Sequence, residues 1–297
     1  MGVDLQVNGQ LGIGFDDPNL TAEQTRTTFR ACLEHCDGFV ATIVTAAPET
    51  LVRNLRMVGR ITAEPEFIGR VHGLHLEGPF LSAARGAVGA HEPAWIQPPT
   101  VGAWRWLFDA AEGRIRILTI AADVPGAADV CAAAVDDGVI VGLGHHLATV
   151  DDLARLADAG ATLLTHLGNG LPLELHRHHN PLLAALASRG LDPTIIADGH
   201  HLPPHVIRLI VDHFGPQRVT VISDAANLAG LPPGRYRHRD GWVSLEPDGK
   251  LWDPAGGWLA GSSRNMAQCI DHLRQLGYSA ADIAQMTDIN PRRILGR

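Results

Sequence analysis

The sequence lacks the features that direct a chain to a membrane or to nucleic acid. No apolar run reaches the roughly 20 residues that a membrane-spanning helix needs, and no charged and apolar leader segment opens the chain. The net charge is −8, and no basic stripe with interleaved aromatic side chains is present. We therefore expect a cytoplasmic protein that binds neither nucleic acid nor a membrane.

Cysteine is also scarce, and its spacing argues against two common frameworks. The four cysteines, Cys32, Cys36, Cys131 and Cys269, form neither a paired disulfide pattern nor a CxxC metal motif. Cys32 and Cys36 would lie one turn apart on a predicted helix as partly buried thiols. Unpaired thiols suit a reducing compartment.

What the sequence does have is a regular alternation of short apolar runs and amphipathic stretches over 297 residues. The apolar runs predict strands near Val3–Val7, Phe39–Val44, Gly69–Leu76, Arg116–Ala121, Val139–Leu143, Ala161–Thr165, Thr194–Ala197 and Val219–Ser223. The amphipathic stretches predict helices that include Ala22–Cys36, Pro48–Ile61, Gly126–Asp136, Val150–Ala159 and His205–His213. This repetition predicts an α/β fold, a (β/α)8 barrel of the TIM type, as one domain over residues 1–297. An open doubly wound sheet is the alternative, but no GxGxxG motif follows the first strand.

Two segments interrupt the alternation. Leu81–Thr100 is rich in glycine and proline and predicts a long loop after the third strand. Ala226–Gly257 contains Asp240-Gly241 and Asp248-Gly249, which are hairpin signals, so we expect a β-hairpin insertion after the eighth strand. The last predicted helix, Ala280–Met286, leads into Asn290-Pro291 and ends there.

Four side chains capable of metal or proton chemistry follow predicted strands: Glu77, His145, His166 and Asp224. Side chains alternate along a strand, so His145 is expected on the face of Val141 and Leu143, and His166 on that of Thr162 and Leu164. The same rule places Asp224 with Thr220 and Ile222, and Glu77 with Gly73 and His75. If these faces point into the barrel, all four residues meet at its C-terminal mouth, where barrel enzymes carry their active sites.

One carboxylate and two imidazoles can hold a divalent ion with a position left open for water, and Asp224 could then act as a general base. Taken singly, each residue has a simpler interpretation. A glutamate before Gly-Pro is often a turn residue, an isolated histidine is often a buried structural side chain, and an aspartate after a strand is often a helix cap. The joint placement favours the metal site.

The ordered motifs resemble those of the N-acetylglucosamine-6-phosphate deacetylases of the amidohydrolase superfamily, over nearly the whole chain. The matching segments are Asp4–Gly9, Gly73–Phe80, Gly89–His91, Gly144-His145 with Ala148-Thr149, Thr165–Leu167, Asn169, Arg177, Ile196–Gly199, His201, Ser223–Ala225, Leu259–Ser262 and Asn290-Pro291. The HLEGPF and LAGS segments are the most specific of these.

The resemblance implies roles for individual residues. Glu77, His145 and His166 would bind one divalent metal ion, with zinc favoured over iron, cobalt or manganese. Asp224 would be the catalytic acid and base, and His201 would contact the substrate near its scissile amide. The remaining substrate contacts are implied for Asn169, Gly170, Arg177, Leu259, Ala260 and Gly261.

Arg177 suits a phosphate because its guanidinium presents a fork of donors. The alternative is a solvated loop cation beside His176 and His178. The first strand carries Gln6 and Asn8 where many amidohydrolases have two metal-binding histidines, so we expect a mononuclear site.

The chain also departs from the family pattern. Gly168 and Gly170 replace an aromatic residue and an alanine, and Ala121-Ala122-Asp123 stands where a proline and a glutamate are usual. The family's small β-domain is expected to be absent, because the chain begins at the first strand and ends at Asn290–Arg297. A homodimer is implied by the resemblance.

The expected reaction is hydrolysis of N-acetylglucosamine 6-phosphate to glucosamine 6-phosphate and acetate. One alternative is the same chemistry on another N-acyl or cyclic amide. Another is a non-catalytic phosphosugar-binding protein, which would have no use for a base at the metal site.

Overall fold

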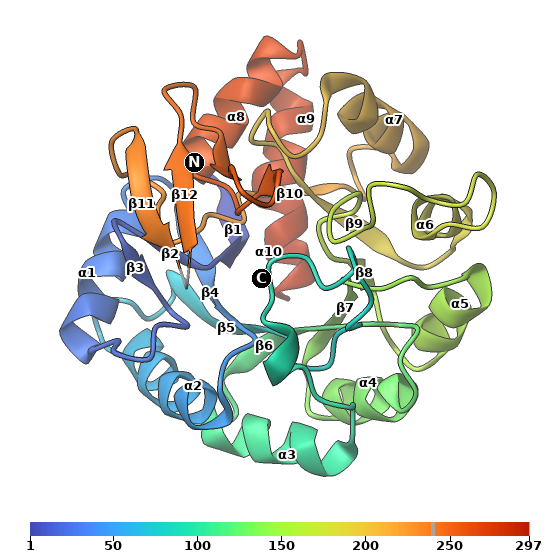
Figure 1. The fold of residues 1–297 in the computed structure, drawn as a ribbon, viewed down its shortest axis with the longest axis horizontal. Helices are drawn as coiled ribbons and strands as arrows, with labels where there is room; N and C mark the ends of the chain where they lie inside the picture. The colour runs from blue at the N-terminus through green and yellow to red at the C-terminus, as the bar shows by residue number, and fades with distance from the viewer. Residues whose placement is uncertain (239–240, 297) are drawn as a thin grey trace.

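Eight parallel strands form a nearly closed barrel in the computed structural model, which describes residues 1–238 and 241–296 (Figure 1). Neighbouring strands follow one another along the chain: β1 (Val3–Val7), β4 (Gly38–Val44), β5 (Val71–Glu77), β6 (Ile115–Ile120), β7 (Ile140–Leu143), β8 (Leu163–Leu164), β9 (Asp192–Ile196) and β10 (Thr220–Ile222). The predicted (β/α)8 barrel is confirmed, and each predicted strand end lies within two residues of the observed one.

The barrel closes between its first and last strands through few contacts. Val7 pairs with Ala225 in an isolated parallel bridge, and the amide of Asn8 donates to the carbonyl of Ala225 at 2.8 Å. Lower in the seam, Oδ1 of the buried Asp4 accepts hydrogen bonds from the backbone amides of Gln6 and Ser223, each at 3.2 Å. A carboxyl side chain therefore supplies the acceptor that a neighbouring strand would normally provide.

The helices surround the barrel (Figure 1). They are α1 (Ala22–Cys32), α2 (Pro48–Thr62), α3 (Val101–Ala110), α4 (Ala127–Asp136), α5 (Val150–Asp158), α6 (Pro181–Ala187), α7 (Pro204–Phe214), α8 (Met266–Gln275), α9 (Ala280–Ala284) and α10 (Asn290–Ile294). Capping boxes at Thr21, Thr149 and Asn265 fix where α1, α5 and α8 begin, because each cap satisfies free backbone amides. None of the helices in the described part of the chain is long and apolar enough to span a membrane.

The last predicted helix is present, but its predicted end was wrong. Helical backbone continues from α9 through a π-helical segment, Gln285–Ile289, into α10. Pro291 lies in the first turn of α10, where the missing amide hydrogen costs little. Asn290 is buried and donates to the carbonyl oxygens of Pro216 and Val219 at 2.8 and 2.6 Å, which anchors this junction to the barrel.

The barrel interior changes from apolar to polar toward the mouth. Its lower part holds an apolar cluster of Val3, Leu5, Val40, Ile117, Ile196, Ile222 and the C-terminal Leu295. Above this cluster the ring of His75 lies 2.8 Å from the hydroxyl of Thr119 and 3.3 Å from that of Thr42. Burial lowers the pKa of His75 to about 4, so this imidazole is a neutral part of the polar layer.

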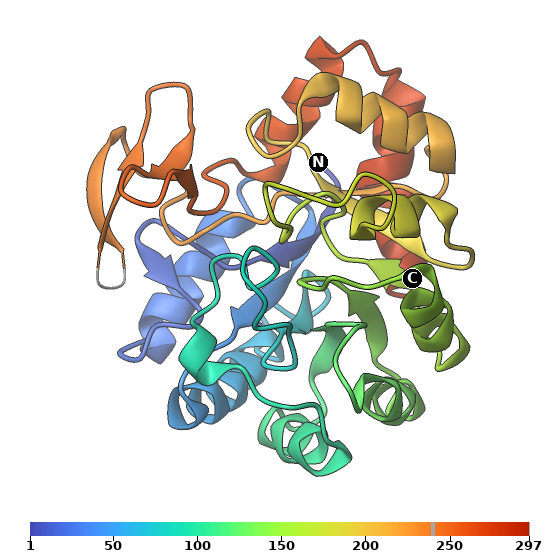
Figure 2. The ribbon, with the colours of Figure 1, turned by 45° about the vertical axis from the view of Figure 1, so that its right-hand side comes forward.

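The insertion after β10 is larger than the predicted hairpin. Its four strands, β11 (Gly234–His238), β12 (Gly241–Leu245), β13 (Leu251–Asp253) and β14 (Trp258–Leu259), form an antiparallel sheet in chain order. The predicted turn at Asp248-Gly249 joins β12 to β13, whereas Asp240 lies outside the described residues. Figure 2 shows this insertion sheet standing out from the barrel.

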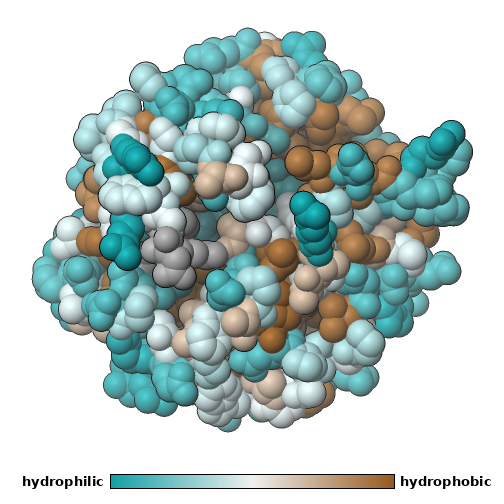
Figure 3. All heavy atoms as spheres, viewed as in Figure 1, coloured by the Kyte–Doolittle hydropathy of each residue, from teal (hydrophilic) through white to brown (hydrophobic). Residues whose placement is uncertain are grey.

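Two further segments lie near the mouth. A short hairpin of β2 (Gly9–Gln10) and β3 (Ile13–Gly14) follows β1 and was not predicted. The predicted long loop after β5 is present and contains a 3-10 turn, Pro93–Trp95. In the space-filling view, hydrophilic residues cover much of this face, and hydrophobic residues gather mainly on its right-hand side (Figure 3).

Candidate active site

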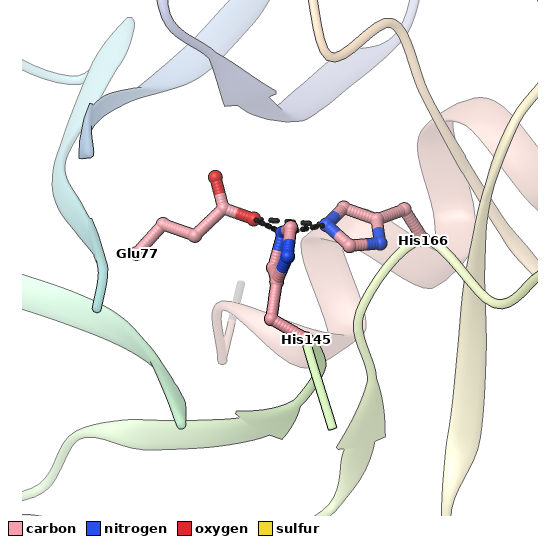
Figure 4. Close-up of side chains that lie close together, drawn as sticks. All are labelled: Glu77, His145 and His166. Atoms are coloured by element: carbon pink, nitrogen blue, oxygen red, sulfur yellow. Dashed lines mark hydrogen bonds and ion pairs between the residues drawn. The ribbon is translucent and has the colours of Figure 1, made fainter. Parts of the chain in front are cut away.

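Glu77, His145 and His166 point toward one another at the C-terminal end of the barrel (Figure 4). Glu77 ends β5, and the two histidines follow β7 and β8. Oε1 of Glu77 lies 3.2 Å from Nε2 of His145 and 2.9 Å from Nε2 of His166, and the two Nε2 atoms are 3.1 Å apart. All three residues are buried.

The tautomer of His145 indicates what this group of atoms can bind. Its Nδ1 lies 2.9 Å from the carbonyl oxygen of Ala87, so Nδ1 carries the proton and donates it, which leaves a lone pair on Nε2. That lone pair faces a carboxylate oxygen and a second imidazole nitrogen. A cation between the three atoms would satisfy all of them, and two imidazoles with one carboxylate are a common ligand set for a divalent metal. The geometry therefore fits a divalent metal ion.

The charge of Glu77 is consistent with this use. Burial alone would raise the pKa of its carboxyl group. The adjacent imidazoles of His145 and His166 outweigh that effect and hold the pKa of Glu77 well below its usual value. The group is therefore a carboxylate across the physiological pH range.

The two histidines reach the site by a different route from the one predicted. Val141, Leu143 and Leu164 belong to the apolar cluster that packs against the outer helices, so they do not face the barrel interior. On β7 the inward position is Gly142, where a Cβ atom would approach the Thr165 hydroxyl to 2.5 Å. The face assignment for His145 and His166 was therefore wrong, although both residues do meet Glu77.

A left-handed backbone turns these side chains inward. His145, His166 and Asp224 have φ values of 53°, 34° and 50°, and they are three of the five non-glycine residues with positive φ in the described chain. Such conformations cost on the order of 1–3 kcal/mol each and tend to occur at functional sites. They allow a residue just past a strand to point at the barrel axis instead of continuing the alternation.

Asp224 is held next to this group by two side-chain amides. Its Oδ1 accepts hydrogen bonds from Nε2 of Gln6 at 3.0 Å and from Nδ2 of Asn8 at 2.7 Å. The same Gln6 nitrogen lies 3.1 Å from Oε2 of Glu77. Gln6 and Asn8 thus present hydrogen-bond donors here, and a donor group cannot ligate a second metal ion.

The pKa of Asp224 suits proton transfer near neutrality. Burial is the main cause that raises it to about 6, and the negative charge of Glu77 adds to this effect. A group with such a pKa can both accept and release a proton at physiological pH.

The two small residues next to His166 lie against the candidate metal ligands. Asn169 is half-buried, and its side-chain amide donates to the carbonyl of His166 at 3.2 Å. Gly170 has φ of 61°, and a Cβ atom there would lie 2.9 Å from Nδ1 of His145. The backbone at Gly170 therefore covers one side of the His145 ring.

Arg177 is not brought into contact with these residues. It is exposed on the segment between β8 and α6, and it forms no hydrogen bond or ion pair with any described residue. Its neighbour His176 instead organises this segment, because Nδ1 of His176 accepts the amides of His178 and His179 at 3.2 and 3.0 Å.

Leu259, Ala260 and Gly261 lead from β14 of the insertion sheet back to the barrel. Ser262 forms an isolated parallel bridge with Ala225, the residue after Asp224. Gly261 has φ of 118°, and a Cβ atom there would lie 2.9 Å from Cβ of Ala226. This segment therefore runs directly beside the one that carries Asp224.

Sequence reasoning assigned no role to two residues that lie in the site. His91 is buried, with Nε2 at 3.3 Å from Nε2 of His145 and Nδ1 at 3.0 Å from the Thr45 hydroxyl. Asp198 is buried, and its Oδ2 lies 2.7 Å from Nδ1 of His201. Both residues are part of matching motifs, and the Asp-Gly-His-His spacing was the available signal for the second.

Nearly the whole chain is similar in sequence to known deacetylases. No protein-family model matches it. The chain is 32% identical to the human N-acetylglucosamine-6-phosphate deacetylase, over 99% of this chain and 73% of the human protein. It is 27% identical to an N-acetylgalactosamine-6-phosphate deacetylase of Escherichia coli O157:H7, over 99% of this chain and 77% of that protein.

A solved structure gives the same result. The structure of the N-acetyl-D-glucosamine-6-phosphate deacetylase of Mycobacterium smegmatis, in complex with N-acetyl-D-glucosamine-6-phosphate, superposes with a TM-score of 0.88. The identity is 31%, and the match covers 99% of this chain and 77% of that one.

Proposed function

The chain belongs to the N-acetylglucosamine-6-phosphate deacetylase family, and we propose that it hydrolyses the N-acetyl group of an amino-sugar 6-phosphate to acetate and the free amine. The observation that carries this proposal is the convergence of Glu77, His145 and His166 at one end of the barrel, with Asp224 bridged to Glu77 by Gln6. A protein that only binds a sugar has no need of a half-buried carboxyl group that can exchange a proton beside these three side chains.

In this mechanism Asp224 moves one proton twice. Its carboxylate first takes a proton from the attacking water as oxygen bonds to the acetyl carbon. It then gives that proton to the sugar nitrogen as the C–N bond breaks, because an amide nitrogen leaves readily only when protonated. A divalent ion held by Glu77, His145 and His166 would supply Lewis acidity toward the carbonyl and the water. We propose zinc, which this donor set suits, with iron, cobalt or manganese as substitutes.

The other matched residues are proposed to hold the substrate. His201 would contact the scissile amide, and Leu259, Ala260 and Gly261 would line the acetyl end. Asn169 and the Gly170 backbone would contact the sugar, with Arg177 at the phosphate. Arg177 is free of partners among the described residues, which leaves its guanidinium available for an anion. We propose either N-acetylglucosamine 6-phosphate or N-acetylgalactosamine 6-phosphate as the substrate, because relatives named for each of these sugars match the chain.

We further propose a homodimer that works in the cytoplasm. Leu173 is 96% exposed and Leu175 37% exposed on the segment that carries Arg177, and a partner subunit would cover these apolar side chains. The four cysteines are free and buried, which suits a reducing compartment.

The alternative is the same hydrolysis of another N-acyl or cyclic amide. Glycine at positions 168 and 170 supports this alternative. Both positions are close to site residues, and neither has a side chain that would shape a pocket for a sugar. A Cβ atom at Gly168 would lie 2.9 Å from Leu202, which follows His201.

Acetate release tests the proposal. Zinc-loaded protein would be assayed on N-acetylglucosamine 6-phosphate, its galacto epimer and the unphosphorylated sugars, with Asp224→Asn as the inactive control. Turnover of a phosphorylated sugar that is lost in Asp224→Asn supports the proposal. If the protein binds one equivalent of zinc but hydrolyses none of these sugars, the proposed substrate is wrong, and other amides should then be tested.

A further inference from the structure

The loop after β9 places a buried aspartate against the histidine proposed to contact the substrate. Asp198 lies just beyond the end of β9, and 3% of its surface is exposed. Its Oδ2 accepts a hydrogen bond from Nδ1 of His201 at 2.7 Å. Its Oδ1 accepts the backbone amides of His200 and His201, each at 2.9 Å. One carboxylate therefore fixes both the backbone and the side chain of His201.

The contact leaves only one nitrogen of His201 for the site. Because Nδ1 faces Asp198, Nε2 is the atom that can meet a substrate. His201 also lies near Asp224. Burial and Glu77 raise the pKa of Asp224, whereas the electrostatic effect of His201 lowers it. The histidine is thus oriented toward the reacting region by a group that is itself shielded from it.

Asp198 remains charged in this environment. Burial would raise the pKa of its carboxyl group, but hydrogen bonds from the His201 side chain and from the two backbone amides outweigh burial and place the pKa below its ordinary value. Its Oδ2 lies 2.7 Å from Nδ1 of His201, so Nδ1 carries a proton and donates it to this carboxylate. An imidazole with protons on both nitrogens offers Nε2 as a donor, whereas an imidazole with its proton on Nδ1 alone offers Nε2 only as an acceptor.

We propose that Asp198 is a positioning residue that aims His201 and keeps its Nε2 as a hydrogen-bond donor to the oxyanion that forms at the scissile carbonyl. This inference rests on the proposed amide hydrolysis. A donor aimed at the developing negative charge lowers the barrier more than it strengthens ground-state binding, so its loss acts on kcat. The purely structural alternative is that Asp198 only holds the loop through the two backbone amides.

Asp198→Asn separates the two roles. The asparagine oxygen can still accept both backbone amides, but the side chain no longer offers a carboxylate oxygen to Nδ1 of His201. We expect kcat to fall by about 10²–10⁴, the range for loss of one proton-transfer or oxyanion group, with KM within a few-fold. Asp271→Asn, an exposed carboxylate paired with Arg274, is the matched control and should change neither parameter.

A spectroscopic measurement tests the same contact without substrate. A proton shared between an imidazole and a buried carboxylate gives a far-downfield resonance, which should be present in the wild-type protein and absent in both Asp198→Asn and His201→Asn. Unchanged kcat in a folded Asp198→Asn variant, or a downfield proton that survives in it, would overturn the proposal. If Asp198→Asn does not fold, the spectrum of the wild type is compared with that of His201→Asn instead. The absence of a far-downfield resonance from the wild-type spectrum would also overturn the proposal.

The two proposals fail in different ways. A wild-type protein that hydrolyses none of the sugars but shows the resonance, lost in both variants, contradicts the proposed substrate and supports the pairing of Asp198 with His201. Activity on the phosphorylated sugar with no effect of Asp198→Asn supports the deacetylase and removes Asp198 from the mechanism.

Discussion

One side-chain nitrogen of Gln6 lies 3.0 Å from Asp224 and also 3.1 Å from Glu77, so a neutral amide separates the half-buried carboxyl group of Asp224 from the buried one of Glu77. Each hydrogen on that nitrogen can meet one carboxylate oxygen. The arrangement fixes the spacing of the two acids and offsets part of their mutual repulsion, without adding a charge of its own.

Replacing Gln6 by methionine should remove this bridge while keeping a side chain of similar length. A hydrogen bond to a charged group contributes about 1.5–3 kcal/mol, so we expect kcat/KM to fall by roughly 10- to 100-fold. The zinc content, measured by elemental analysis, should stay the same, because Gln6 donates to Oε2 of Glu77 and leaves Oε1 to the metal position. A variant with unchanged kcat/KM would show that the bridge is dispensable.

The pH profile reports on Asp224. Its pKa is raised to about 6, and only the ionised form can accept a proton from water. We expect kcat/KM to be constant above this pH and to fall about tenfold per pH unit below it. In the metal-loaded enzyme the fall should begin at a lower pH, because a nearby cation stabilises the carboxylate. Asp224→Asn should retain zinc and lose several powers of ten in turnover. Turnover within a few-fold of the wild type would refute the assignment of Asp224 as the base.

Arg177→Ala should act on the phosphate end of the substrate. The loss of a charge-assisted contact predicts a rise in KM of about 10- to 100-fold for the phosphorylated sugar, with little change in kcat. The comparison uses steady-state kinetics on phosphorylated and plain sugars. Equal losses on both would place Arg177 outside the phosphate site, and Arg189→Ala, an exposed arginine on another loop, provides the control.

Asp4 should make the folded protein less stable as pH rises. Burial is the main cause that raises its pKa from 3.8 to about 7 in the folded state. Below pH 3.8 both the folded and unfolded chains carry the proton, so there is no penalty. Between that pH and about 7, Asp4 ionises only in the unfolded chain, so the free energy of unfolding falls as pH rises. The total loss is about 4 kcal/mol, because each of about three pKa units contributes 1.36 kcal/mol. Above about pH 7 the loss is constant, because Asp4 is ionised in both states.

Asp4→Asn removes this dependence while keeping an acceptor for the amides of Gln6 and Ser223. Relative to the wild type, the variant should gain about 2–3 kcal/mol in unfolding free energy between pH 5 and pH 8. Urea unfolding at the two pH values measures the difference, and Asp129→Asn, at an exposed site on α4, should show none. A gain that is the same at both pH values would mean that Asp4 is already ionised in the folded protein.

The strands could be predicted because their apolar and β-branched runs are bounded by glycine, proline and polar residues. The insertion was underestimated for the opposite reason: β13 has three residues and β14 has two, so neither forms a run long enough to indicate a strand. The helix beyond Asn290 was missed because a proline usually ends a helix, and nothing in the local sequence reveals that Pro291 lies in a new first turn.

The meeting of Glu77, His145 and His166 could be predicted from the sequence, but the backbone geometry that brings them together could not. Glu77 follows the strand alternation, so its position could be derived from the sequence. His145 and His166 depart from it through positive φ angles, which histidine does not signal as glycine would. Asp198 was passed over because an aspartate before glycine is usually part of an ordinary turn, and only the folded loop shows its contact with His201.

The attachment of the insertion sheet has a consequence for how this enzyme can diverge. The turn between β12 and β13 meets the barrel through the carbonyl of Asp248, which accepts from Nε2 of His200 at 3.2 Å and from Arg264. The same sheet leads into Leu259–Gly261, whereas the candidate metal ligands rest on the strand ends beneath it. Sequence changes in the insertion sheet could therefore alter which substrates are accepted, while the candidate metal ligands and Asp224 stay the same.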